Sequence, residues 1–287
     1  MFCGTCHLFL LVLLRFSITI TKKKFDKMNL LIGSSGYVGS TLRAQTHFDF
    51  LYNSHNIASI KKEIDGVVVC AAAPSQKWIA NRNPSADLQN IKNLIVHLKS
   101  IRCVSFILIS TVDVFKIPNN VDENTHVVED GLSPYGLHRR MLENFVENNF
   151  ENYLIVRLAG LVGPGLRKNI IFDFQNNNNL NQIDSRNVFQ FYPMVNLWRD
   201  IQITLDEKIN LIHLTAEPIT VADVSKLGFD KIFNQKLSSP PVKYDMRTIY
   251  AKLFGAKGYY QYSRHESIQA IRAYAQSETK KLEIKNT

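Results

Sequence analysis

A glycine-rich turn directly after a short apolar run constrains the fold of this chain more than any other feature. The run Leu30–Ile32 leads into GSSGYVG at residues 33–39, and residues 37–46 have the periodicity of a helix. Glycine lets the chain turn tightly between a strand and a helix, and it lets backbone N–H groups at the helix start approach a pyrophosphate. The spacing GxxGxxG after a first strand therefore predicts a dinucleotide-binding turn. Its candidate contacts are Gly33, Ser35, Gly36, Tyr37, Val38 and Gly39.

Short apolar runs alternate with helical stretches up to about residue 160. Most of the runs are continuous and rich in β-branched residues, which is typical of strands buried on both faces of a parallel sheet. The alternation predicts an α/β fold with a Rossmann-type, doubly wound parallel sheet. Strands are expected at 30–32, 48–52, 66–70, 106–109 and 153–157, and helices at 37–46, 90–99 and 135–146.

The pattern loosens after residue 165. An asparagine-rich stretch at 176–179 indicates a loop, 210–214 is a candidate strand, and 269–281 is a candidate surface helix. We therefore expect a dinucleotide-binding domain at residues 28–165. Residues 166–287 would form a smaller C-terminal substrate-binding lobe, interleaved with the edge of the first domain.

Residues 1–27 differ from the rest and are expected to be an N-terminal extension outside the core. The apolar run at 8–14 is interrupted by Arg15, and about 18 or more apolar residues are needed to span a bilayer. Stable membrane insertion is not expected, although a weak interfacial anchor is an alternative. The plainer interpretation is a translated upstream extension with Met28 as the true start, and whether these residues are genuinely translated stays open.

Charge and cysteine content narrow the class of protein. Residues 1–27 carry a net charge of +4 out of the +9 of the chain, so the remainder is ordinary, and no basic stripe with interleaved aromatics indicates nucleic-acid binding. The positive bias suits a phosphorylated small molecule. The four cysteines show neither a disulfide framework nor a zinc-binding pair of CxxC motifs, so no metal is expected and a cytoplasmic location fits.

The stretch SPYGLHRR at residues 133–140 places Tyr135 and Arg139 four positions apart. On a helix this spacing puts both side chains on one face, where a cation favours the ionised form of a phenol and prepares it for proton transfer. Ser133 and Pro134 suit the start of that helix. An ordinary helix-surface pair is the alternative. His138 is expected to pack and the neighbouring Arg140 to be solvated.

The end of the second strand helps to choose the cofactor. An NAD site usually has a carboxylate there for the ribose hydroxyls, whereas this chain has Asn53 and Ser54. Neutral groups accept a 2′-phosphate better than an acid does, so NADP is favoured, with NAD as the alternative. The same two residues could merely form a turn.

With the glycine turn and the YxxxR motif, the chain resembles the extended short-chain dehydrogenase/reductase family. It is most similar to the branch of dTDP-4-dehydrorhamnose reductases and nucleotide-sugar epimerases, and the resemblance covers nearly all of residues 28–225. The supporting segments are VVVCAAA at 67–73, Asn83-Pro84 followed by Asn90, ILISTVDVF at 107–115, VRLAGLVGPG at 156–165 and ITVADV at 219–224.

The resemblance implies roles for individual residues. Tyr135 would exchange the hydroxyl proton while the nicotinamide carbon exchanges hydride, and Thr111 would hold the same substrate oxygen. The residue at 139 would depress the pKa of the tyrosine and hold the nicotinamide ribose. Here Arg139 replaces the family lysine, and Phe115 replaces a frequent tyrosine. Further cofactor contacts implied by the resemblance are Ala71, Ala72, Ala73 and the structural Asn90.

Candidate substrate-binding residues follow the first domain. Arginine forks match phosphate oxygens and could clamp a substrate diphosphate, although scattered surface charge is an equal interpretation. The leading function is an NAD(P)-dependent reductase or epimerase acting on a nucleotide-linked sugar, with a homodimer left open. The alternative is a non-catalytic relative that binds cofactor and regulates a partner enzyme. The candidate substrate contacts are Arg167, Lys168, Asn169 and Arg186.

Overall fold

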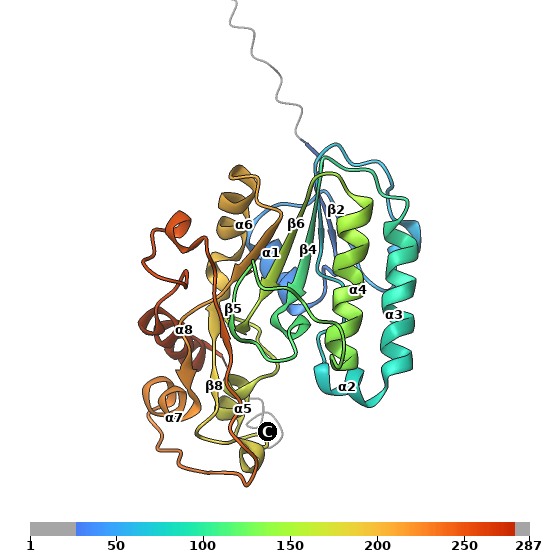
Figure 1. The fold of residues 1–287 in the computed structure, drawn as a ribbon. Helices are drawn as coiled ribbons and strands as arrows, with labels where there is room; N and C mark the ends of the chain where they lie inside the picture. The colour runs from blue at the N-terminus through green and yellow to red at the C-terminus, as the bar shows by residue number, and fades with distance from the viewer. Residues whose placement is uncertain (1–26, 279–287) are drawn as a thin grey trace, which may run out of the picture.

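The computed structural model describes residues 27–278, which contain a six-stranded parallel sheet (Figure 1). Its strand order is β10-β6-β4-β3-β1-β2, and every neighbouring pair is parallel. The predicted doubly wound α/β fold is therefore confirmed. The strands are β1 (Leu30–Ile32), β2 (Phe50–Tyr52), β3 (Val67–Cys70), β4 (Ser105–Thr111), β6 (Tyr153–Leu158) and β10 (Leu211–Leu214).

The strand order reverses direction at β1. From β1 the chain crosses first to β2 on one side, and then to β3 on the other side. Open α/β sheets bind their ligands in the crevice at the carboxyl ends of strands where this reversal occurs. The glycine turn begins directly after β1, so the fold places it at that crevice.

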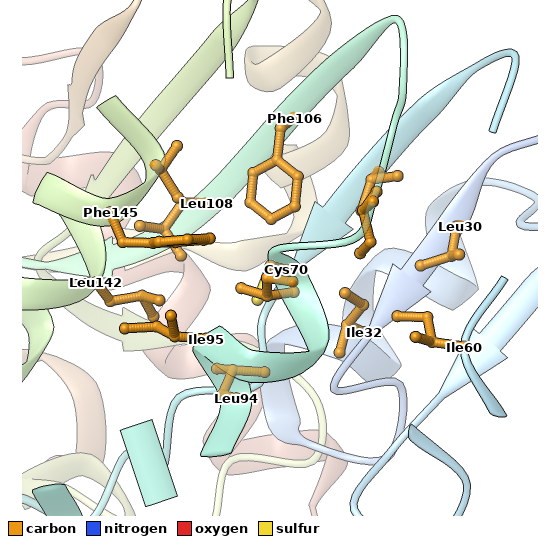
Figure 2. Close-up of a cluster of buried hydrophobic side chains, with 14 of the residues drawn as sticks. Leu30, Ile32, Ile60, Cys70, Leu94, Ile95, Phe106, Leu108, Leu142 and Phe145 are labelled. Atoms are coloured by element: carbon orange, nitrogen blue, oxygen red, sulfur yellow. The ribbon is translucent and has the colours of Figure 1, made fainter. Parts of the chain in front are cut away.

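Helices cover both faces of the sheet (Figure 1). On one face α3 (Pro84–Leu98) and α4 (Pro134–Asn149) bury an apolar cluster that Figure 2 shows, and on the other lie α1 (Tyr37–Gln45) and α6 (Leu197–Asp206). Side chains along each strand alternate between the two clusters, because successive residues of a strand point to opposite faces. In β4, for example, Phe106 packs under α4 and Ile107 packs toward α6. This double burial explains the continuous apolar runs.

A smaller lobe has its own apolar core, which includes Phe174 and Ile271. The lobe contains α5 (Ile170–Asn176), α7 (Val221–Asp223), a following π-helical turn (Val224–Gly228) and α8 (Arg264–Ser277). Three two-stranded pairs accompany it: β7 (Gly160–Val162) with β9 (Phe191–Pro193), β8 (Val188–Phe189) with β11 (Ile219–Thr220), and β5 (Asn119–Val121) with β12 (Asp245–Met246).

Several sequence predictions need correction. The strand expected at 210–214 is β10 of the main sheet, so the chain returns to the first domain after entering the lobe. The helix expected at 269–281 begins at Arg264, after a capping box formed by Ser263 and Glu266, and one of its faces is buried. The helix expected from residue 90 begins at Pro84, whose missing N–H is tolerated at a helix start.

The helices α2 (Lys77–Arg82), α5 and α6 were not expected from the sequence. The six-residue α2 is too short to show a helical period. The extension predicted at 1–27 lies outside the described residues except for Lys27. Within residues 27–278, no helix is long and apolar enough to cross a membrane.

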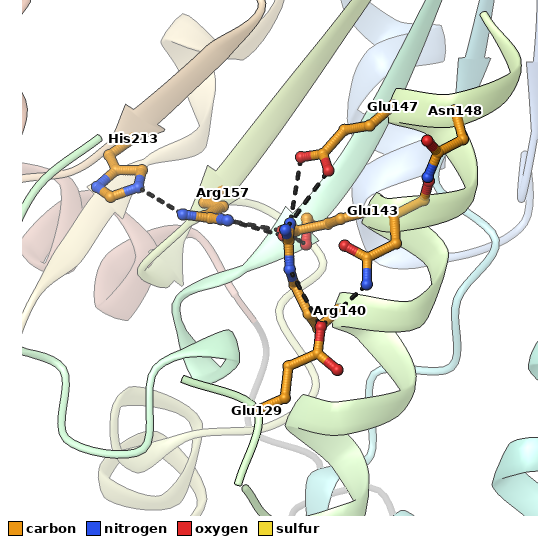
Figure 3. A network of polar contacts seen from close by, with 9 residues as sticks. Glu129, Arg140, Glu143, Glu147, Asn148, Arg157 and His213 are labelled. Carbon is orange, nitrogen blue, oxygen red and sulfur yellow. Dashed lines mark hydrogen bonds and ion pairs between the residues drawn. The ribbon is translucent and has the colours of Figure 1, made fainter. Parts of the chain in front are cut away.

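A buried polar network ties α4 to three strands (Figure 3). The fully buried Glu143 accepts hydrogen bonds from Ser110 at 2.5 Å and from Arg157 at 3.0 and 2.8 Å. Arg157 also contacts His213 of β10 at 3.3 Å. Arg140, expected to be solvated, instead pairs with Glu143 at 2.9 Å. Because a buried charge needs its partners, this network fixes α4 in one position on the sheet.

We expect Arg157→Met to lower the free energy of unfolding by about 3 kcal/mol, because it leaves Glu143 as a buried carboxylate without its bidentate partner. Arg140→Met, at the partly exposed end of the same network, should cost about 1 kcal/mol or less. Urea denaturation of both variants measures the difference. Equal losses would contradict the assignment of Arg157 as the main partner.

Candidate active site

The glycine turn packs against the end of β3. Gly33 has a positive φ of 86°, and a side chain there would lie 2.4 Å from the Ala71 carbonyl oxygen. A side chain at Gly39 would lie 2.1 Å from the Gly33 carbonyl oxygen. These two glycines are therefore needed for the turn to fold against residues 71–73. The structure brings together both segments that the sequence predicted to contact the cofactor.

The start of α1 is open to an anion. Its N-cap residue is Gly36, and no side chain of the described residues caps it. A side chain at Gly36 would meet only the Gly33 carbonyl oxygen, at 3.4 Å, so the space before the helix start is free. Ser35 and Gly36 are exposed there. The Tyr37 hydroxyl donates to the Gly163 carbonyl at 3.2 Å, which ties α1 to the segment that follows β7.

The residues after β2 form a turn beside the glycines. The Gly33 N–H donates to the Tyr52 carbonyl at 2.8 Å, which places the end of β2 next to the glycine turn. The Asn53 side chain accepts from the His55 N–H at 2.9 Å, and Ser54 is exposed. Asn53 thus has the turn role that the sequence left open. Asn53 and Ser54 also leave this end of the strand without a carboxylate.

The first turn of α4 positions Tyr135. The Ser133 hydroxyl accepts from the Gly136 N–H at 3.3 Å, and Asn81 of α2 accepts from the Tyr135 N–H at 3.0 Å. A side chain at Gly136 would lie 2.2 Å from the Asp113 carbonyl oxygen, so α4 packs on the backbone just beyond β4. This contact brings Tyr135 next to Thr111, the two residues to which the family resemblance assigns the same substrate oxygen.

Tyr135 is a buried phenol with opposing influences on its acidity. Burial is the largest influence and raises its pKa; the charge of Asp113 adds to this. The charge of Arg139, a hydrogen bond with the Thr111 hydroxyl and the charge of Lys77 act in the opposite direction. Burial prevails and the pKa of Tyr135 is raised, so the phenol keeps its proton at neutral pH. Arg139 therefore acts on the pKa of Tyr135 in the expected direction, but its charge does not offset the effect of burial.

Arg139 is buried, with 3% of its surface exposed, so the surface-pair alternative for it is wrong. Its guanidinium carbon lies 4.0 Å from the centre of the Tyr135 ring, which is a cation–π arrangement. It donates hydrogen bonds to the Asp87 carboxylate and the Pro74 carbonyl. Its Nε atom has no hydrogen-bond partner among residues 27–278. The arginine is therefore held against the tyrosine by α3 and the segment after β3.

Asp87 is the residue of α3 that reaches this site. Besides Arg139, it contacts His138 at 2.7 Å, so His138 is a buried polar residue and not only a packing residue. Burial raises the pKa of Asp87, but the hydrogen bonds from Arg139 and His138 outweigh this effect and lower it. The predicted Asn90 lies one turn further along α3 and is exposed.

A second cluster lies beside Thr111. The Asp113 N–H donates to the Thr111 hydroxyl at 3.2 Å, and the Asp113 carboxylate pairs with Lys77 of α2 at 2.7 Å. Tyr244, from the segment before β12, donates to the same carboxylate at 3.0 Å. No sequence motif predicted this cluster, because its members come from three separate segments.

The four candidate substrate contacts differ in exposure and in hydrogen bonding. Lys168 donates to the Ser75 carbonyl, and partial burial together with the charge of Arg139 lowers its pKa to about 8. Arg167 is exposed. Asn169 caps α5 by accepting from the Ile171 N–H at 2.9 Å and donates to the Leu161 carbonyl at 2.9 Å. Arg186 makes a bidentate pair with Asp184 and donates to the carbonyls of Leu237 and Ser239.

Comparison with known proteins gives a family match. The model of the NAD dependent epimerase/dehydratase family matches residues 43–200, more than half of the chain. Comparison with curated protein sequences gives no match. Among solved structures, the chain is similar to a dTDP-4-dehydrorhamnose reductase from Clostridium acetobutylicum, with a TM-score of 0.67 and 19% identity over 87% of this chain and 99% of that chain.

Two further structures have the same fold. One is a dTDP-4-dehydrorhamnose reductase from Bacillus anthracis in complex with NADP, with a TM-score of 0.67 and 15% identity over 88% of this chain and 100% of that chain. The other is a UDP-glucose 4-epimerase from Thermotoga maritima with UDP-glucose, with a TM-score of 0.64 and 16% identity over 87% and 98%. Together with the family match, the motifs lead to one conclusion: the chain belongs to the NAD dependent epimerase/dehydratase family.

Proposed function

We propose that this protein is an NAD(P)-dependent reductase or epimerase that acts on a nucleotide-linked sugar. The observation that carries the proposal is the placement of Tyr135 beside Thr111, on the edge of the sheet where the glycine turn opens. A phenol and a hydroxyl side by side at that edge can together hold one substrate oxygen. The division near residue 165 into a cofactor-binding part and a substrate lobe is part of the same proposal.

The residues around the glycine turn fit a dinucleotide. The uncapped start of α1 can accept a pyrophosphate, and Gly36 leaves the space in front of it free. Residues 71–73 lie against Gly33, where they can flank the adenosine. NADP is the favoured form, because Asn53 and Ser54 present no carboxylate to its 2′-phosphate. A similar structure, the Bacillus anthracis reductase, is described as a complex with NADP.

The chemistry then divides between cofactor and protein. A bound nicotinamide supplies or accepts the hydride. Tyr135, which keeps its proton at neutral pH, donates that proton to the substrate oxygen, and Thr111 holds the same oxygen by a hydrogen bond. Arg139, on the ring face of Tyr135, stabilises the phenolate that remains.

The substrate class follows from chemistry and similarity. The similar structures are described as acting on dTDP-linked or UDP-linked sugars. Arg167, an exposed cation at the start of the lobe, and Lys168, whose ammonium also donates to the Ser75 carbonyl, are candidates to bind a diphosphate. Asn169 and Arg186 contribute by holding the lobe in shape, because their side chains are already hydrogen-bonded within it.

A second candidate is a non-catalytic cofactor-binding protein that regulates a partner enzyme. The observation that favours it is the engagement of Arg139 with Asp87 and Pro74, because these bonds occupy donors that could otherwise hold a ribose. Hydride exchange with a panel of nucleotide sugars would support the enzyme. Isolation of a stable complex with another protein, without such exchange, would support the regulator.

We expect Tyr135→Phe to lower turnover by about 100-fold or more, because proton transfer is lost, while NADPH affinity stays nearly unchanged. Arg139→Ala should damage both turnover and affinity. Absorbance of the reduced cofactor measures turnover, and fluorescence titration measures affinity. Turnover of Arg139→Ala at the wild-type rate would exclude the arginine from the mechanism.

We expect NADPH to bind more tightly than NADH, because no carboxylate at Asn53 or Ser54 repels the 2′-phosphate. Titration by intrinsic fluorescence, with both cofactors at the same ionic strength, measures the ratio. An exchange of Asn53 for aspartate should reverse or narrow the preference. Tighter binding of NADH by the unaltered protein contradicts the assignment.

Two glycines of the turn provide a matched pair. Gly39→Ala should lower the free energy of unfolding by about 1–3 kcal/mol, because the new methyl group overlaps the Gly33 carbonyl. Gly36→Ala should cost less than about 1 kcal/mol but weaken NADPH binding, because its methyl group enters the space before α1. Thermal unfolding and NADPH titration separate the two effects. Unchanged affinity in Gly36→Ala would show that the pyrophosphate lies elsewhere.

A further inference from the structure

One face of α2 points at the reacting groups. Asn81 accepts a hydrogen bond from the backbone N–H of Tyr135, and Lys77 lies one turn earlier on the same helix. Residues four apart share a helix face. The hydrogen bond of Asn81 therefore fixes where Lys77 projects, and its ammonium pairs with Asp113 at 2.7 Å.

Asp113 needs a cation at this place. Its backbone N–H bonds the Thr111 hydroxyl, and its carboxylate is only 16% exposed. The negative charge opposes ionisation of Tyr135, whereas the charge of Lys77 favours it. Partial burial lowers the pKa of Lys77, but the ion pair with Asp113 outweighs this effect and raises it. The lysine therefore stays charged at neutral pH.

The charged groups around Tyr135 come from several elements. Arg139 of α4 lies on its ring and is itself paired with Asp87 of α3, which also holds His138. Asp113 follows β4, and Lys77 comes from α2. Further from the ring, the Tyr244 hydroxyl donates a hydrogen bond to the Asp113 carboxylate. The charge of Asp113 raises the pKa of Lys168, and the charge of Arg139 lowers it. Of these groups, Asp113 opposes the phenolate, and Arg139 and Lys77 favour it.

We propose that Lys77 is an electrostatic residue of the active site, which neutralises Asp113 and, with Arg139, stabilises the phenolate form of Tyr135. This inference deepens the proposed function and rests on it for its meaning in turnover. In this arrangement two cations stabilise one phenolate. The arginine is fixed on the ring face, and the flexible stem of the lysine keeps its ammonium beside the carboxylate next to Thr111. Lys77 positions charge and need not touch the substrate.

The test measures the ionisation of residue 135 directly and needs no substrate. 3-Chlorotyrosine is placed at position 135 by nonsense suppression, because its phenol ionises at lower pH and its phenolate absorbs apart from other tyrosines. In Lys77→Met the midpoint of this titration should rise by about one pH unit. This is near the lower end of the pKa shifts that a neighbouring charge causes, because Lys77 is partly exposed and water screens its charge. Lys77→Arg should keep the wild-type midpoint.

Matched variants separate charge from structure. Arg82→Met removes an exposed cation from the other end of α2 and should leave the midpoint unchanged. Adding Asp113→Asn to Lys77→Met should return the midpoint toward the wild-type value, because the uncompensated carboxylate is gone. Circular dichroism checks folding, and Lys77→Gln replaces Lys77→Met if the latter unfolds.

An unchanged midpoint in the folded Lys77→Met or Lys77→Gln protein overturns the proposal, as does an equal rise in Arg82→Met. Absence of hydride transfer with every nucleotide sugar overturns the proposed function instead and leaves the titration readable. If the proposed function and the role of Lys77 are both correct, the pH midpoint that the phenol gives to turnover should also rise in Lys77→Met. If the ion pair of Lys77 with Asp113 had only a structural role, Lys77→Met would lower the stability of the protein without moving the titration midpoint of residue 135.

Discussion

The contact between Gly136 and the backbone of Asp113 determines the geometry of the site. Because glycine has no side chain, the first turn of α4 can lie directly on the peptide that follows β4. The turn cannot slide, since Ser133 caps it from one side and Asn81 holds the Tyr135 N–H from the other. One close backbone approach thus makes neighbours of two residues that are 24 positions apart in the sequence, Thr111 and Tyr135.

Burial of Tyr135 makes its phenolate form unfavourable, and the surrounding cations offset part of this effect. A phenol removed from water resists ionisation, and a neighbouring carboxylate adds to the resistance. An arginine suits the fixed position on the ring face, because its planar group can stack and still donate to Asp87 and Pro74. A lysine could not use those partners in the same way. The arginine of the YxxxR motif and the carboxylate of Asp87 are therefore best understood together.

Local patterns predicted the parts of the structure that depend on nearby residues. The apolar strands, the glycine turn and the Ser133 cap follow from short motifs or from spacing on one element, whereas the pairing of Thr111 with Tyr135 was implied only by the family resemblance. Asp87 was not predicted, because its partner Arg139 is 52 positions away, and any exposed-looking polar residue of α3 could have been chosen instead. Asn90 was chosen for its place in the family motif, one turn beyond the residue that points inward. Lys77 was missed because α2 is too short to show a period.

The segment from Ala71 to Lys77 links the glycine turn to the surroundings of Tyr135. Its first residues lie against Gly33, and its middle carbonyls, those of Pro74 and Ser75, accept hydrogen bonds from Arg139 of α4 and from Lys168 of the lobe. Its last residue pairs with Asp113 beside Thr111. A dinucleotide that lies along residues 71–73 would therefore contact a segment that is also bonded to α4, to the lobe and to the end of β4. Two of these attachments involve charges that act on the pKa of Tyr135: Arg139 at the Pro74 carbonyl, and the pair of Lys77 with Asp113.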